Sequence, residues 1–102
     1  MTSIEIKSEY IEVKGHSGYA PIGSDIVCAA ISTLSQATYN YLEATGNDMG
    51  VETSDGYLKM IFKSQLNKAG EEILNSFIEM AKDLEGQYEK YMKVEGDIIW
   101  KY

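Results

Sequence analysis

The chain has 102 residues, of which 44% are hydrophobic and 25% charged, and its formal net charge at neutral pH is −7. These values predict a single soluble domain over residues 1–102 and exclude a membrane span, because no apolar run is long enough. The negative charge argues against direct binding of nucleic acid, which depends on a basic surface, and permits a basic peptide partner.

Two short strands are predicted near the N-terminus. Ile4 and Ile6 share one parity of the sequence, whereas Ile11 and Val13 share the other, so one continuous strand would place the two pairs on opposite faces. A turn or kink at residues 7–9 restores a single buried face. We therefore predict two strands, or one bulged strand, within residues 3–14.

A long helix is predicted over residues 25–44, because apolar side chains recur there at spacings of three and four. Ser24 or Asp25 is expected to cap the start of this helix by accepting a hydrogen bond from a free backbone N–H. Gly46 is a suitable residue to end it.

The second half of the chain predicts a hairpin and another helix. The Asp-Gly pair at residues 55–56 is typical of a tight turn within a hairpin over residues 49–63, with both turn residues expected at positive φ. A second helix is expected over residues 68–84, with Asn67 as its N-cap and Gly86 as the residue that ends it.

The remaining residues, 92–94 and 98–100, are expected to be extended and to add an edge strand. Taken together, these elements predict an α+β fold, in which a small, largely antiparallel sheet has two helices packed on one face.

Cys28 is the only cysteine and His16 the only histidine, twelve positions apart. One cysteine cannot form an internal disulfide, so we expect a free thiol in the cytoplasm. Cys28 falls in the first turn of the predicted helix, where free N–H groups and the helix dipole favour a thiolate. The N–H groups around Val27 and Cys28 would also form an oxyanion hole. Cysteine is equally a common small buried residue, which leaves an unreactive thiol open.

Three further residues are candidates for this site, and each has a second interpretation. His16 is either the base that activates Cys28 or a surface histidine at a strand end. Asp25 either caps the helix or orients the imidazole. Ser32, one turn after Cys28, either supports the site or bonds the carbonyl of Cys28.

The segment between His16 and the helix, residues 17–23, is small and glycine-rich. It is either a flap that closes over a substrate or an ordinary connection. Its candidate substrate-loop residues are Gly18, Tyr19, Pro21 and Gly23. The glycines do not form a phosphate-binding motif, and one histidine with one cysteine falls short of a zinc site, so we expect neither metal nor cofactor.

Gly15-His16 and the run Gly-x-Asp-Ile-Val-Cys-Ala-Ala-x-Ser at residues 23–32 strongly resemble the ribosomal-processing cysteine proteases of the Prp family. This resemblance implies a cytoplasmic homodimer with a Cys/His dyad, in which Cys28 is the nucleophile and His16 the base. It assigns supporting roles to Asp25 and Ser32. The implied substrate is the short N-terminal extension of a large-subunit ribosomal protein, which links the enzyme to ribosome biogenesis.

Two alternatives stand beside this interpretation. Members of the family carried by prophages would process a phage capsid or scaffold precursor. A non-catalytic module would instead bind a basic or extended peptide by adding it to a sheet edge, with the motif retained for folding. The second alternative predicts an unreactive Cys28.

Overall fold

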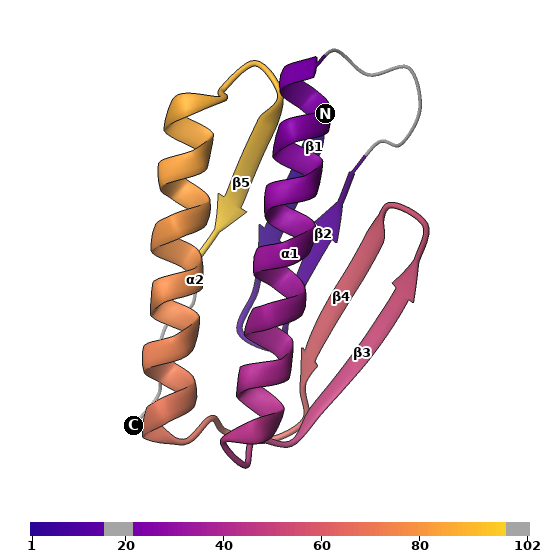
Figure 1. Cartoon of the computed structure of the whole chain (residues 1–102). Coiled ribbons are helices and arrows are strands. Elements are labelled where there is room, and N and C mark those ends of the chain that lie inside the picture. The colour runs from indigo at the N-terminus through magenta and orange to yellow at the C-terminus, as the bar shows by residue number, and fades with distance from the viewer. Residues whose placement is uncertain (16–21, 98–102) are drawn as a thin grey trace.

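A computed structural model of the chain describes residues 1–15 and 22–97, and for residues 22–25 it describes the backbone alone. Figure 1 shows two helices side by side, both on the same face of one sheet. This arrangement confirms the predicted α+β fold. The elements, in chain order, are β1 (Thr2–Ile6), β2 (Tyr10–Lys14), α1 (Ile22–Ala44), β3 (Met49–Ser54), β4 (Tyr57–Phe62), α2 (Lys68–Gln87) and β5 (Met92–Gly96).

Strands β1 and β2 form an antiparallel hairpin at the middle of the sheet. Ile4 pairs with Val13, and Ile6 pairs with Ile11. The chain reversal at residues 7–9 therefore places the even-numbered and the odd-numbered apolar residues on the same face of the sheet. All four side chains are buried in the core. The version of the prediction with two separate strands is therefore confirmed.

The strand order β3-β4-β2-β1-β5 gives a mixed sheet that is antiparallel except where β5 pairs with β1. The extended structure expected for residues 92–94 is confirmed, whereas residues 98–100 lie outside the described residues. At the opposite edge, β3 and β4 are joined at Asp55 and Gly56, as predicted. Of these two, Gly56 alone has a positive φ, 68°, so the expectation for Asp55 is wrong.

Helix α2 packs an apolar stripe, with Leu74 and Phe77 at its centre, against the sheet. The side chain of Asn67 accepts a hydrogen bond from the N–H of Gly70 at 2.8 Å, which confirms the predicted N-cap. The helix continues past residue 84 to Gln87, because the N–H of Tyr88 still bonds the carbonyl of Leu84.

Helix α1 begins at Ile22, three residues before the predicted start. Gly23 favours a loop locally, but a helical glycine costs only about 1 kcal/mol relative to alanine, which the rest of a long helix offsets. Ser24 and Asp25 therefore lie within the first turn, and the prediction that one of them caps the helix is wrong. At the other end, Gly46 has a φ of 89° and lies two residues beyond Ala44, the last helical residue, as expected of a residue that ends the helix.

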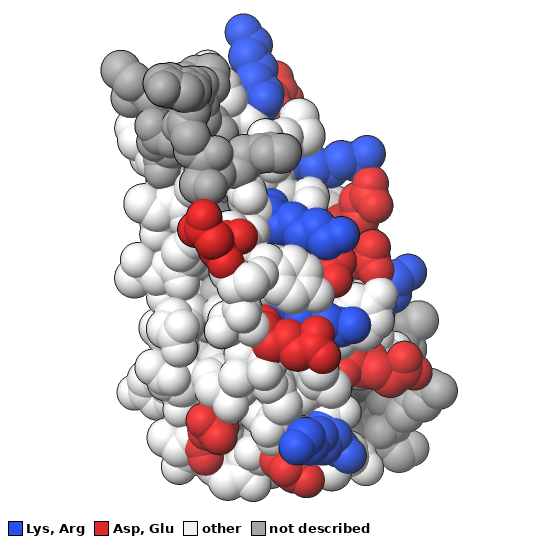
Figure 2. All heavy atoms as spheres, turned by 90° about the vertical axis from the view of Figure 1, so that its right-hand side faces the viewer, with Lys and Arg blue, Asp and Glu red and all other residues white. Residues whose placement is uncertain are grey.

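The two helices differ in charge, because α2 carries several acidic and basic residues and α1 carries few. Helix α1 has no charged residue between Ile26 and Leu42. Most charged side chains visible in Figure 2 lie on the sheet side, with both signs interspersed. Despite its uncharged stretch, α1 is too polar to cross a membrane, and the same is true of the other helix in the described part of the chain.

Candidate active site

Cys28 is half-buried and is the seventh residue of α1, in its second turn. Only the N–H groups of the first turn of a helix lack an intrahelical acceptor, and the influence of the helix dipole also fades beyond that turn. The predicted place of Cys28 in the first turn is therefore wrong. An oxyanion hole formed by the N–H groups of Val27 and Cys28 is excluded for the same reason.

Cys28 lines a cavity of about 510 Å³ between α1 and the β3–β4 hairpin. The structure brings Ser32 to the same cavity, one turn further along α1, as the spacing predicted. Apolar groups alternate with hydroxyl groups along the walls. The lining comprises Cys28, Ile31, Ser32, Ser35 and Gln36 of α1, Thr2, Val13 and Gly15 from the first hairpin, and residues 53–58.

The sulfur of Cys28 is enclosed on one side by the N-terminal hairpin. The Oγ1 atom of Thr2 lies 3.1 Å from this sulfur, within hydrogen-bond distance. A Cβ atom at Gly15 would lie 3.1 Å from the sulfur and 3.6 Å from that hydroxyl, so glycine permits the close approach. Thr2 belongs to no motif, but its parity with Ile4 is a signal that a polar side chain faces the core.

Ser35 lies two turns beyond Cys28 and is completely buried. Its Oγ atom has no hydrogen-bond partner among the residues that the structure describes. Thr38 shows the usual alternative, because its hydroxyl donates to the carbonyl of Leu34 at 2.7 Å. The wall of the cavity thus carries a hydroxyl that no described residue pairs.

Several predicted site residues lie outside the described residues, namely His16, Gly18, Tyr19 and Pro21. For Gly23 and Asp25 the structure describes a helical backbone alone. The proposed dyad and the supporting role of Asp25 therefore stay predictions. Within the described ranges, no group of three or more His, Cys, Asp and Glu side chains could hold a metal ion.

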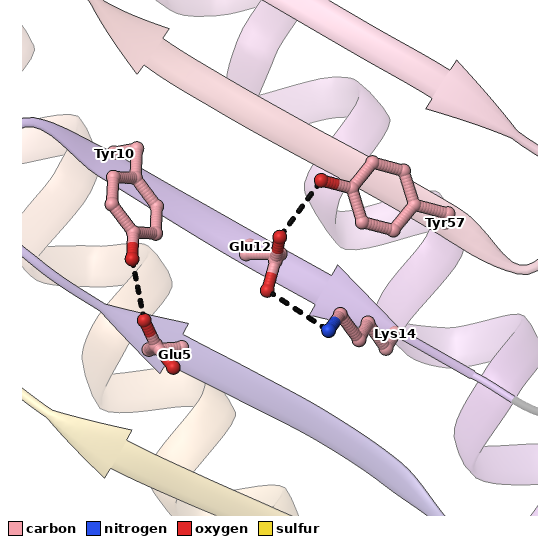
Figure 3. Close-up of polar contacts among 5 residues, drawn as sticks. All are labelled: Glu5, Tyr10, Glu12, Lys14 and Tyr57. Carbon is pink, nitrogen blue, oxygen red and sulfur yellow. Dashed lines mark hydrogen bonds and ion pairs between the residues drawn. The ribbon is translucent and has the colours of Figure 1, made fainter.

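The open face of the sheet carries paired tyrosines and carboxylates next to the cavity (Figure 3). The hydroxyl of Tyr57 donates to Glu12 at 2.8 Å on this open face, and Lys14 lies 3.4 Å from the same carboxylate. The hydrogen bond from Tyr57 lowers the pKa of Glu12, with Lys14 adding to the effect, and it raises the pKa of Tyr57 to about 12. Tyr57 therefore keeps its proton at neutral pH and offers no base to the cavity.

A similar pair lies one strand away. The hydroxyl of Tyr10 donates to Glu5 at 2.5 Å, and this hydrogen bond raises the pKa of Tyr10. The ammonium group of Lys59 lies 4.3 Å from the centre of the Tyr10 ring. On this face, side chains of both charges thus form hydrogen bonds and ion pairs that link the adjacent strands β1, β2 and β4.

The fold is similar to that of several bacterial proteins. It resembles SMU.848 from Streptococcus mutans, with 24% identity, a TM-score of 0.72, and coverage of 92% of this chain and 90% of the other. It also resembles the ribosomal processing protease Prp from S. aureus in complex with a covalently linked product peptide (18% identity, TM-score 0.76) and with a substrate peptide (15%, 0.74). Both comparisons cover 92% of this chain and 95% of the other.

At these identities, the structural likeness establishes the fold alone. None of the curated protein sequences compared with this chain matches it. The sequence model of the family described as cysteine protease Prp, however, matches residues 1–93, which is most of the chain. The resemblance seen in the motif is thereby confirmed, and the chain belongs to the cysteine protease Prp family.

Proposed function

We propose that the chain is a cysteine endopeptidase in which Cys28 is the nucleophile and His16 is the base. The observation that carries the proposal is the position of Cys28 on a cavity of about 510 Å³, with Gly15 against its sulfur. His16 follows Gly15 directly in the chain. Membership of the Prp family supports this chemistry.

The proposed reaction follows the usual course of covalent catalysis by a thiol. His16 takes the proton from the sulfur of Cys28, and the thiolate attacks the carbonyl carbon of the scissile bond to form a tetrahedral oxyanion. The intermediate collapses, and the C–N bond breaks as His16 returns the proton to the leaving amine. Water then hydrolyses the thioester, which releases the carboxylate and restores the thiol. No step needs a metal ion or an organic cofactor.

Asp25 and Ser32 are the proposed supporting residues. In the helix α1, positions 25 and 32 lie one turn before and one turn after Cys28, on the same face. We assign Asp25 to orient the imidazole of His16 and Ser32 to hydrogen-bond within the cavity. We assign Gly18, Tyr19, Pro21 and Gly23 to close over the bound substrate.

The proposed substrate is the short N-terminal extension of a large-subunit ribosomal protein, processed in the cytoplasm by a homodimer. Two observations support a peptide substrate of this kind. The S. aureus relative is a ribosomal processing protease that has been crystallised with substrate and product peptides. The net charge of −7 also attracts the basic peptides that are typical of ribosomal proteins.

The test is cleavage of a synthetic peptide that spans such an extension, with the cut mapped by mass spectrometry. Cys28→Ala is expected to abolish cleavage, and His16→Ala to slow it by about 10²–10⁴-fold. Ser76→Ala is the matched control, because Ser76 is exposed on α2 and does not line the Cys28 cavity. Equal turnover by Cys28→Ala and the wild type would exclude the proposed nucleophile.

Chemical labelling separates the protease from a peptide-binding module. Cys28 is the only cysteine, so iodoacetamide reports on it alone. The enzyme predicts alkylation that is faster than that of a free cysteine and slower once His16 is replaced. A peptide that binds without being cut, together with alkylation no faster than that of a free cysteine, would favour the module.

A further inference from the structure

Thr2 is a polar residue on the buried face of β1. It shares this face with Ile4 and Ile6, and all three side chains are 1% exposed. A valine would fill the same volume and favour the strand equally well. A buried hydroxyl is destabilising unless it is hydrogen-bonded, so its partner is informative about why threonine stands there.

The partner of the Thr2 hydroxyl is the sulfur of Cys28, at 3.1 Å. Either group can donate while the thiol carries its proton. Once the thiol ionises, the sulfur has only lone pairs to offer, and the hydroxyl becomes the donor. A hydrogen bond donated to an ionised group stabilises its charged form, and it is stronger than a bond between neutral groups.

The backbone holds Thr2 in place. Its N–H donates to the carbonyl of Tyr91 at 2.8 Å, and its Cα pairs with that of Met92 in β5. Its neighbour Ser3 pairs with Lys14 on the opposite side, in β2. Because strands flank β1 on both sides, the hydroxyl is fixed relative to the sheet and does not depend on a loop.

Gly15 encloses the same sulfur from the end of β2. Its N–H donates to the carbonyl of Gly56 at 2.8 Å, which ties this residue to the β3–β4 turn. A side chain at Gly15 would compete with the sulfur and with the Thr2 hydroxyl for the same space. The sulfur is thus bounded by Thr2 and Gly15 at the sheet, while the cavity adjoins it.

We propose that Thr2 is a positioning residue for Cys28, whose hydroxyl fixes the sulfur and donates a hydrogen bond to the thiolate. This inference rests on the proposed function, because it assigns Thr2 to the nucleophile of the same site. Thr2 keeps its own proton throughout, and the proton of Cys28 still goes to His16.

The test compares Thr2→Ser with Thr2→Ala. Both variants lose the methyl group, and only the second loses the hydroxyl. Iodoacetamide alkylation of Cys28 at about pH 7 is expected to slow about tenfold in Thr2→Ala and to stay within about twofold of the wild type in Thr2→Ser. The difference between variants should narrow toward about pH 9.5, where an ordinary thiol is mostly ionised without help.

The pH profile separates positioning from mere packing. Loosened packing would change the alkylation rate by a similar factor at every pH, and it would affect both variants. Equal rates in Thr2→Ala and Thr2→Ser at about pH 7, or a ratio that does not change with pH, overturn the proposal. Thermal unfolding of both variants verifies that each is folded at the assay temperature.

Peptide cleavage by the same proteins separates this inference from the proposed function. If Cys28 is required for cleavage and Thr2→Ala matches the wild type in both assays, the role of Thr2 is wrong and the protease assignment stands. If the wild type cuts no peptide but Thr2→Ala still slows alkylation in the stated pH-dependent way, the contact is upheld and the protease assignment fails.

Discussion

Just beyond the C-terminal end of α1, the buried side chain of Asn47 links the helix to the start of α2, whereas Cys28 and Ser35, earlier in α1, line a cavity. The amide nitrogen of Asn47 donates to the carbonyl of Leu42 at 3.1 Å, and it also lies within hydrogen-bond distance of Thr45 and Asn67. The carbonyl oxygen of Asn47 accepts from the backbone N–H of Asn67 at 2.9 Å. Both ends of this amide are therefore satisfied.

The cavity differs from this region in its hydrogen bonding and in the burial of its side chains. The hydroxyl of Ser35 is completely buried and has no partner within the described part of the chain, and Cys28 is half-buried beside a cavity. Buried polar groups that serve the fold alone are normally paired, so exceptions point toward sites where a ligand completes the set. We infer that the hydrogen bonds of Asn47 stabilise the fold, whereas the residues around the cavity leave the thiol accessible and contribute less to stability.

The largest expected effect comes from removing the side chain of Asn47, whose polar groups are all hydrogen-bonded. Asn47→Ala should lower the free energy of unfolding by about 3 kcal/mol, because it removes together the hydrogen bonds that this side chain makes with Leu42, Thr45 and Asn67. Ser35→Ala, by contrast, removes a hydroxyl with no partner and should change stability by less than about 0.5 kcal/mol or increase it. Urea denaturation of both variants measures the difference. Similar losses of unfolding free energy in the two variants would show that Asn47 and Ser35 do not differ in this way.

A pair of glycines gives an intermediate effect. A Cβ at Gly70 would lie 2.7 Å from Nδ2 and 2.8 Å from Oδ1 of Asn47, so Gly70→Ala must displace this amide and should destabilise the protein by about 1–3 kcal/mol. At Gly15 the backbone does not have a positive φ, and the nearest atom to a Cβ is the Cys28 sulfur at 3.1 Å.

Gly15→Ala is therefore expected to change the alkylation rate of Cys28 several-fold while changing stability by less than about 1 kcal/mol. Urea denaturation and iodoacetamide labelling of both glycine variants test whether Gly70→Ala changes mainly stability and Gly15→Ala mainly the alkylation rate. A loss of stability in Gly15→Ala that equals the loss in Gly70→Ala would count against the comparison.

The smallest effect concerns Tyr57, whose hydroxyl has a partner on the open face of the sheet. The hydrogen bond to Glu12 raises the pKa of Tyr57 from 10.0 to about 12, so in that pH window the folded state binds more protons than the unfolded state. The free energy of unfolding should therefore fall as the pH rises from 10 to about 12. Tyr57→Phe should reduce this slope slightly, because the pair is exposed to solvent.

Ultraviolet absorbance of tyrosinate is the measurement for this pair. The wild type should show a tyrosine that titrates near 12, and Tyr57→Phe should lack it. Glu12→Gln serves as the control, because it keeps a hydrogen-bond acceptor but removes the charge. A wild-type titration in which every tyrosine ionises near its ordinary pKa would refute the assignment.

The sequence predicts the parts of this molecule that depend on local chemistry. The change of parity between Ile6 and Ile11 identifies the first hairpin, and Asn67 marks the start of α2, because each depends on residues close in the chain. The start of α1 is misjudged, because the local preference of Gly23 loses to the extension of an established helix.

The candidate site divides in the same way. The spacing of Cys28 and Ser32 places both on one face of α1, so their shared cavity can be predicted. The contact between Thr2 and Cys28 joins residues 26 positions apart, and the hairpin wall of the cavity comes from residues 53–58. Such pairings depend on how the sheet and helix pack, which periodicity does not specify.

The parallel pairing of β1 with β5 has a consequence for the order of events during synthesis. Thr2 and Met92 are register partners although they are 90 positions apart in the chain. Strand β1 is therefore translated long before β5, the strand with which it pairs. Long-range parallel pairings form slowly, since the intervening chain must first be ordered. On a growing polypeptide, Cys28 is thus translated well before the strand that pairs with Thr2, so the contact between Thr2 and Cys28 is expected to form late.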